Sequence, residues 1–452
     1  MKGRLSLSIG SCGLLLAFWG LYKDWGLIAQ PFYAWAWWSY LLCLDGFVQI
    51  RTGGSLMTSR RPLLLPVLLW STTFWSFFEL LNLRLQNWYY VEVFGRGDEV
   101  DVLAGGLFGI VCFATVLTGL FETHDALGAL GLFRGLRSKP RKLPSWLPNA
   151  LQGLGVAMIV TALVFPYYLG PLVWGSLSLV LDPWNYRRGA RSLLADWEGG
   201  RIQVPLRLLV AGFLCGLVWE SFNFLAPQKW LYTVRGLEGM KLFEMPLLGF
   251  LGFPALAIDA FAMFSAVSFT FHGNETWEPR TRVPRGPRLS LIMATLPIHV
   301  VFWLSVTLAI KDANVGSIEL RLSHLQNLSS ESIASLAEIG IERPRQLLRA
   351  LEDPSERDGL PIPEDVRPAL IEEIHLLTFK GIGFHHGTLL QNSGVATVKA
   401  LSASDPERLY LELTANRRKD AFPTLRPEHV RLWVDAARYA VEREALATTT
   451  AR

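Results

Sequence analysis

Apolar runs about as long as a membrane is thick dominate the first 310 residues of this sequence. A helix needs about 20 mainly apolar residues to cross the hydrocarbon core of a bilayer. We predict spans at residues 7–22, 31–50, 62–83, 101–121, 150–166, 168–182, 205–225, 246–270 and 289–310. With 51% hydrophobic residues and 17 Trp among 452, the chain is too apolar for an ordinary soluble domain. The predicted fold class is therefore an all-α, polytopic helical membrane bundle.

Two stretches of the chain share one pattern of acidic, amide and aromatic residues. The first is FWSFFELLNLRLQNWYY at 74–90, and the second is LVWESFNFLAPQKWLY at 217–232. A spacing of three residues puts the Glu and the Asn of each stretch on one helix face. The corresponding pairs are Glu79 with Glu220, Asn82 with Asn223, Trp88 with Trp230, and Tyr90 with Tyr232.

The correspondence extends to both sides of these stretches. An apolar helix ending in Leu-Asp precedes each one, with Asp45 in the first copy and Asp182 in the second. A Gly-spaced apolar helix follows each one, in which Val116 corresponds to Asp259. We predict two tandem repeats of four spans, which share one orientation and are related by an axis along the membrane normal. The expected segments are repeat one at 1–135, repeat two at 136–275, a basic loop and last span at 276–312, a soluble domain at 313–445, and a disordered tail at 446–452.

Charged residues in the loops predict the topology. The loop at 134–142 is basic, whereas the loop at 92–101 carries four acids. Because Lys and Arg are enriched in cytoplasmic loops, we expect a cytoplasmic N-terminus in an inner membrane of bacterial type. Nine spans would place the C-terminal domain on the non-cytoplasmic side.

The C-terminal region has the composition of a soluble helical domain. Residues 311–452 hold 18 Lys and Arg against 21 Asp and Glu. Gly381-Ile382-Gly383 predicts a tight turn between two helices, and Asp405-Pro406 predicts a capped helix start. The last helix should turn Leu432, Trp433, Ala436 and Tyr439 inward.

These residues resemble a family of uncharacterised tandem helix-hairpin-helix domains. The resemblance covers about 120 residues, and its first half keeps only Gly340-Ile341 in place of a Gly-x-Gly turn. Such a turn, here Lys380, Gly381 and Gly383, can hold a nucleic-acid phosphate on its backbone N–H groups. The excess of acids argues against nucleic acid as a partner. We therefore expect this domain to contact a protein.

The second repeat resembles the lycopene cyclase domain of carotenoid biosynthesis. The matching residues are Trp219-Glu220, Trp230-Leu231-Tyr232, the stretch 239–242 and Pro246, but Leu247-Leu248 replaces the family's acidic pair. The resemblance implies a membrane enzyme that cyclises or isomerises an isoprenoid, with acids that protonate a polyene and aromatic rings that face a carbocation. The candidate catalytic residues are Glu79, Glu220, Asn82 and Asn223. The candidate ligand-binding residues are Trp88, Tyr90, Trp219, Trp230 and Tyr232.

Structural roles compete with these chemical ones. The aromatic residues fit an interfacial belt, the Glu–Asn pairs fit a solvated polar clamp between repeats, and Asp45 and Asp182 fit salt bridges to Arg51 and Arg187. No metal or nucleotide motif is present, so no cofactor is expected. Our leading hypothesis is a multi-pass scaffold in contact with membrane lipid, which presents its C-terminal domain to a protein. The alternatives are a lipid- or isoprenoid-handling protein or enzyme and membrane-anchored DNA binding; the sequence leaves the substrate and the oligomeric state open.

Overall fold

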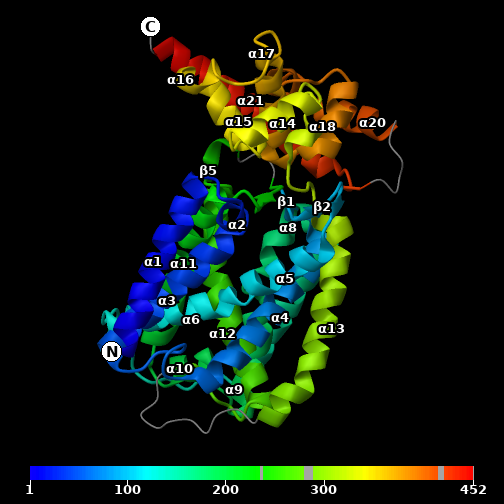
Figure 1. Ribbon diagram of the computed structural model, residues 1–452. Helices are drawn as coiled ribbons and strands as arrows, with labels where there is room; N and C mark the ends of the chain where they lie inside the picture. Colours follow the sequence, from blue (N-terminus) through cyan, green and yellow to red (C-terminus); the bar gives the residue numbers. More distant parts are fainter. Residues whose placement is uncertain (235–237, 279–288, 416–421, 451–452) are drawn as a thin grey trace. The chain divides into compact units, whose positions relative to one another are not determined.

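The computed structural model describes residues 1–234, 238–278, 289–415 and 422–450, and they divide into two compact units. The first unit comprises residues 1–86, 106–226 and 247–309, and the second comprises 87–105, 227–246 and 310–452. Almost all of the regular structure is helical, which confirms the predicted all-α class (Figure 1). The predicted basic loop falls largely at 279–288, outside the described residues.

The first unit is a bundle of helices that differ widely in length. It contains α1 (Lys2–Tyr22), α2 (Gly26–Ala29), α3 (Phe32–Thr52), α4 (Arg61–Leu85), α5 (Val102–Phe113, which begins in the second unit), α6 (Thr115–Ala129), α7 (Leu147–Val164), α8 (Pro166–Leu169), η1 (Gly170–Val173), α9 (Ser176–Arg188), α10 (Leu193–Glu198), α11 (Gln203–Leu225), η3 (Leu247–Leu251), α12 (Gly252–Phe271) and most of α13 (Leu289–Asn314).

Seven helices among the described residues are long and apolar enough to cross a membrane, where the sequence predicted nine spans. They cover Lys2–Tyr22, Arg61–Leu85, Val102–Ala129, Leu147–Val164, Gln203–Leu225, Leu247–Phe271 and Ile292–Asn314. The span predicted at 168–182 is wrong, because this stretch is broken into α8, η1 and α9. With 13 residues, α9 reaches only about 20 Å. Helix α3 has 21 residues, but it is not among the seven.

The same helix pairs pack in both halves of the first unit. Helix α1 packs on α3 as α7 packs on α9, and α3 contacts α6 as α9 contacts α12. Helix α4 packs on α6 as α11 packs on α12. Glycine permits close packing of α1 on α3 and of α7 on α9. A Cβ at Gly46 of α3 would lie 2.5 Å from the backbone N of Leu7, and one at Gly155 of α7 would lie 2.8 Å from the carbonyl O of Ser176.

The second unit combines the C-terminal helices with two segments that follow α4 and α11 in the chain. Its short strands are β1 (Trp88–Val91), β2 (Gly95–Arg96), β3 (Glu99–Val100), β4 (Lys229–Tyr232), β5 (Lys241–Leu242) and β6 (Met245–Pro246). Its helices are η2 (Glu238–Met240), η4 (Leu322–His324), α14 (Ser330–Glu338), α15 (Pro344–Glu352), α16 (Pro354–Arg357), α17 (Arg367–Thr378), η5 (Phe379–Gly381), α18 (Gly383–Asn392), α19 (Val398–Ser402), α20 (Pro406–Ala415) and α21 (Pro427–Thr450).

The helix ends of this unit follow the local sequence. Asp405 accepts hydrogen bonds from the backbone N–H groups of Glu407 and Arg408 at the start of α20, as predicted. Helix α21 buries Leu432, Trp433 and Ala436, but Tyr439 is 37% exposed, so its predicted inward position is wrong. Helix α21 continues to Thr450, into the stretch for which the sequence predicted a tail.

Candidate functional site

Strands β1 and β4 form an antiparallel ribbon from the two aromatic stretches that the sequence comparison paired. Trp88 pairs with Tyr232, and Tyr90 pairs with Trp230. Four of the five predicted ligand-binding aromatics therefore lie in one ladder. The Trp230 indole N–H donates to the Tyr232 hydroxyl over 2.8 Å, so these polar ring atoms are already hydrogen-bonded within the ribbon.

The turn predicted at Lys380, Gly381 and Gly383 connects α17 and η5 to α18. All three residues have positive φ values, of 44°, 65° and 67°. Glycine tolerates this backbone conformation, which explains why the turn forms at this sequence.

The same turn is packed against other segments of the second unit. A Cβ at Gly381 would lie 2.1 Å from the Cγ1 of Val91 in β1, and one at Gly383 would lie 2.5 Å from the Cβ of Ser317. The Tyr89 hydroxyl donates to the backbone carbonyl of Lys380 over 3.0 Å. The ribbon therefore covers the turn that the sequence identified as a possible phosphate contact.

Ion pairs between buried carboxylates and partly buried cations accompany this packing. Lys380 Nζ lies 2.7 Å from a carboxylate oxygen of Glu244, and Lys229 Nζ lies 3.9 Å from the other. Arg345 pairs with Glu92 over 2.6 Å. Burial of the Lys229 ammonium lowers its pKa to about 8, although Glu244 opposes this shift.

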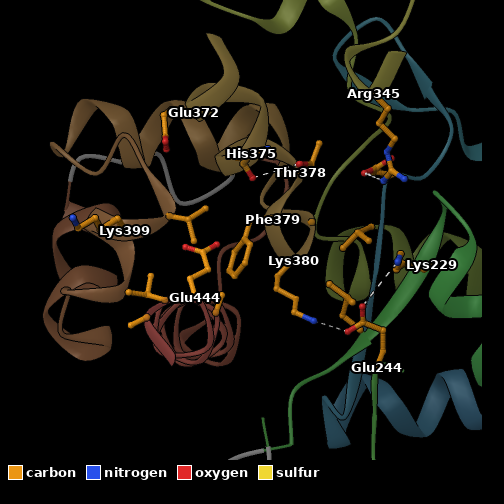
Figure 2. Close-up of a pocket in the computed structure, with 18 residues that line it drawn as sticks. Lys229, Glu244, Arg345, Glu372, His375, Thr378, Phe379, Lys380, Lys399 and Glu444 are labelled. Carbon is orange, nitrogen blue, oxygen red and sulfur yellow. Dashed lines mark hydrogen bonds and ion pairs between the residues drawn. The ribbon is translucent and has the colours of Figure 1, made fainter. Parts of the chain in front are cut away.

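These charged side chains border a cavity of about 740 Å³ within the second unit (Figure 2). The ribbon and Glu244 contribute one side of the lining, and α17 with the turn, α19 and α21 contribute others. Figure 2 shows Lys229, Glu244 and Lys380 on one side, and Lys399 with Glu444 on the opposite side. The sequence singled out Lys380, Gly381, Leu231 and the candidate acid Glu244 separately, but it did not bring them together, because the lining residues come from segments far apart in the chain.

A buried aromatic cluster joins β1 to α21. The Tyr89 and His429 rings lie with centroids 4.1 Å apart, and the Trp433 indole N–H donates to the Tyr89 hydroxyl over 3.3 Å. His429 is 1% exposed. Burial lowers the pKa of His429 well below its ordinary value, and nearby His386 and Arg426 add to this shift. The cluster therefore favours a neutral imidazole.

The candidate catalytic residues lie inside the first unit. Glu79, Glu220, Asn82 and Asn223 are each 0% exposed. The Trp75 indole N–H donates to Glu79 over 2.9 Å, and the Trp75 ring lies 5.1 Å from that of Trp219. Trp219 is 6% exposed and packs among aromatic rings. These contacts link the two motif-bearing helices through tryptophan.

Asp45 and Asp182 do not form the predicted salt bridges. Asp45 instead accepts from the backbone N–H groups of Met57 and Thr58 over 2.7 and 3.2 Å. Asp182 accepts from those of Leu193 and Leu194 over 2.8 and 2.9 Å. Each carboxylate thus accepts hydrogen bonds from backbone N–H groups in the loop or helix start that follows its own helix. Buried N–H groups need an acceptor, and this contributes more to stability than an exposed ion pair does.

Two further buried acids, Glu122 and Asp125, were not singled out from the sequence, whereas Asp259 was considered as a possible catalytic acid. Glu122 is 0% exposed and accepts from the backbone N–H of Leu56 over 3.2 Å. Asp125 pairs with Arg60 over 2.8 Å. Asp259 accepts from the N–H groups at the start of α9, on Gly175 and Ser178. An acid within an apolar run is a signal that can be read from the sequence. Its hydrogen-bond or ion-pair partner cannot be read in the same way, because it lies many residues away in the chain.

The described residues include no group of three or more His, Cys, Asp and Glu placed to hold a metal ion. A bundle with seven membrane-length apolar helices and a separate helical unit defines the class as a multi-pass membrane protein. Residues 326–440 match a family model described as a domain of unknown function, DUF4332. No curated protein and no solved structure matches the chain.

Proposed function

We propose that this chain is a membrane scaffold whose C-terminal domain is of the helix-hairpin-helix type and contacts another protein. The observation that carries the proposal is the packing of the Lys380–Gly383 turn on β1. Strands β1 and β4 directly follow α4 and α11 in the chain. The domain therefore packs against strands that continue from both predicted repeats. This arrangement suits a domain that is held in a fixed position for contact with another protein.

DNA binding is the less favoured function for this domain. A helix-hairpin-helix turn contacts phosphate through backbone N–H groups, which must be accessible. Here Gly381 and Gly383 lie against Val91 and Ser317. The 18 bases and 21 acids of residues 311–452 also provide no net positive charge to attract a polyanion.

Lipid or isoprenoid handling is a second candidate, favoured by the buried acids of the first unit. A carboxylate within an apolar bundle is costly unless it is paired or functional. Glu79 has the Trp75 indole as a hydrogen-bond donor, and this contact supports a structural role equally well. The aromatic surroundings of Trp219 would suit a cation-forming reaction, but the acids that the cyclase family carries after Pro246 are replaced by Leu247 and Leu248.

The membrane orientation belongs to this proposal. We propose a cytoplasmic N-terminus in a bacterial-type inner membrane and, because seven is odd, a C-terminal domain on the opposite side. Cysteines introduced singly at exposed Leu136, in the basic loop at 134–142, and at exposed Leu411 would test it. A membrane-impermeant maleimide applied to intact cells should label the second position and not the first.

Site-specific crosslinking tests the scaffold function. A photoreactive residue at Leu411, which is 66% exposed on α20, should form a saturable crosslink to one protein in native membranes. The matched control is a probe at Leu304, 54% exposed on α13, which should crosslink lipid only. The same protein captured by a chain lacking residues 320–452, through a probe at Leu304, would refute a role for the domain.

A further inference from the structure

The cavity of the second unit has no part in the proposed protein contact. Its volume of about 740 Å³ is large enough for a small molecule. Its lining draws on the ribbon and on five helical segments, so residues far apart in the sequence converge on one space. The charges and apolar groups of this lining decide what the cavity can bind.

One side of the cavity carries a net positive charge. Lys229, Lys380 and Arg345 supply three cations there, and Glu92 and Glu244 supply two carboxylates. Glu244, 5% exposed, is shared by both lysines. This side therefore holds one more positive charge than negative when both lysines are protonated, which favours a ligand group with a single negative charge.

The opposite side has the reverse balance. Lys399 lies there with Glu372 and Glu444 (Figure 2). Two carboxylates against one ammonium repel a second negative charge on the ligand. Polyanions are therefore disfavoured, whereas a molecule with one anionic end is accommodated.

Apolar side chains make up the rest of the lining. Phe379, Val398, Ala440 and Val441 come from η5, α19 and α21, and Val91 with Leu231 comes from the ribbon. They offer a surface for a hydrocarbon body once the anionic group is held.

Desolvation of Lys229 supports an anionic ligand. Burial lowers the pKa of this ammonium to about 8, because water is removed from around a charge. A bound anion within hydrogen-bond reach would compensate the lost hydration and raise that pKa again.

We propose that this cavity binds a small molecule with one monoanionic group, a carboxylate or a phosphodiester, joined to an apolar body. The anion lies among Lys229, Lys380 and Arg345, and the apolar body lies along Phe379 and Val441. The same chemistry occurs in free organic acids and in lipid headgroups, so the test must separate these two sources.

Calorimetric titration of the full chain in detergent micelles measures binding of the soluble monoanions octanoate and dibutyl phosphate at pH 7. Lys229→Met should weaken binding by about tenfold or more, because a charge-assisted hydrogen bond is lost. Glu244→Gln should instead tighten binding about threefold or more, since one repelling charge disappears. Arg408→Gln, an exposed cation that pairs with Glu412 on α20, is the control and should bind as the natural chain does.

The opposite signs of these two effects separate ligand binding from loss of fold, which would weaken binding in both variants. Suberate, the dicarboxylate of octanoate's length, should bind several times more weakly than octanoate. Saturable binding in nanodiscs of phosphatidylglycerol, but not of phosphatidylcholine, would identify a headgroup; binding of the soluble probes alone would identify a free acid. Absence of saturable binding in every arm, or equal affinities for all four proteins, would overturn the proposal.

Discussion

Phe121 packs against Phe264 with ring centroids 5.5 Å apart, and the two residues hold equivalent places in the predicted repeats. Phe121 lies five positions after Val116, as Phe264 lies five after Asp259. A residue touches its own equivalent only where the two copies meet on a twofold axis. We infer that the first unit has such a local axis between α6 and α12.

Exchanged contacts around these helices support the same inference. The Trp37 ring lies 5.9 Å from Trp219, and the Phe78 ring lies 4.9 Å from Trp174. Trp37 precedes Asp45 by eight residues, as Trp174 precedes Asp182, and Phe78 and Trp219 each directly precede the motif Glu. In each predicted repeat the same two positions therefore contact the other repeat, as they do across a twofold interface.

The ribbon of the second unit has matching internal symmetry. Tyr89 faces Leu231, and these are equivalent residues at the centre of the ladder. On either side, Trp88 faces Tyr232 and Tyr90 faces Trp230, so the pairing is unchanged when the strands are exchanged. A duplication of the kind that the sequence predicts would explain why two four-residue strands so far apart in the chain pair in this register.

Asp45 and Asp182 should contribute equally to stability if the repeats are copies. Asparagine at either position keeps one acceptor oxygen but loses the charge that holds two backbone N–H groups. We expect Asp45→Asn and Asp182→Asn each to cost about 1–2 kcal/mol. Thermal unfolding in detergent measures both, with exposed Glu99→Gln as the control; a large effect in only one copy would contradict equivalence.

Glu79 should tolerate an amide but not a hydrocarbon. Gln accepts the Trp75 indole N–H as the carboxylate does, so Glu79→Gln should change the unfolding free energy by less than about 1 kcal/mol. Glu79→Leu removes the acceptor of this half-buried indole N–H and should cost about 1–3 kcal/mol. Mass spectrometry of co-purified lipid serves as a second measurement. Loss of a specific lipid in Glu79→Gln or Glu220→Gln, with stability intact, would favour lipid handling over the scaffold.

The sequence predicted much of this architecture because the signals are local. Apolar length defines membrane helices, and the Gly-Ile-Gly pattern predicts a turn with positive φ at Gly381 and Gly383. The acid, amide and aromatic pattern located the two motif-bearing helices, which the Trp75–Trp219 contact joins. In each case a few neighbouring residues determine the conformation.

Other features depend on partners that the sequence does not reveal. Strands β1 and β4 are four residues each and form only by pairing across the two repeats, so their aromatic residues were read as helix-end anchors. The predicted salt bridges of Asp45 and Asp182 do not form, because both carboxylates accept hydrogen bonds from backbone N–H groups further along the chain. The cavity is assembled from Lys229, Arg345 and Lys380 only once three separate segments have folded together.

The stability of the second unit should fall in acid. The pKa of His429 is lowered by burial in the fold, whereas the unfolded chain binds a proton near its ordinary pKa of about 6.5. Stability is therefore complete above about pH 6.5 and is lost below it, by about 1.4 kcal/mol per pH unit for this one group. His429→Phe keeps a ring against Tyr89 but binds no proton. It should therefore remove about 1.4 kcal/mol per pH unit from the pH dependence of the unfolding free energy.

Pulsed alkylation of a cysteine introduced at buried Ala437, read by mass spectrometry, measures opening of α21 between pH 7.5 and 5.5. His375→Gln is the control, because His375 is partly exposed and pairs with Glu352. An unchanged slope in His429→Phe would assign the acid sensitivity to other groups.

Gly381 and Gly394 provide a matched test of the packing between the turn and the ribbon. Both have positive φ, of 65° and 84°, so alanine adds a similar backbone strain of about 1 kcal/mol at either position. Only at Gly381 would the new Cβ meet Val91, at 2.1 Å, whereas nothing lies within 4 Å of one at Gly394. Gly381→Ala should therefore cost about 2 kcal/mol more than Gly394→Ala.

Val91→Gly removes both side-chain atoms closest to the added Cβ, and should restore much of the stability lost in Gly381→Ala. The same labelling at Ala437 measures all four variants. If the two glycine variants lose equal stability, the turn does not depend on β1 for its position, and the scaffold proposal loses the contact on which it rests. If only Gly381→Ala opens the unit and Val91→Gly reverses it, the ribbon holds the domain through this turn.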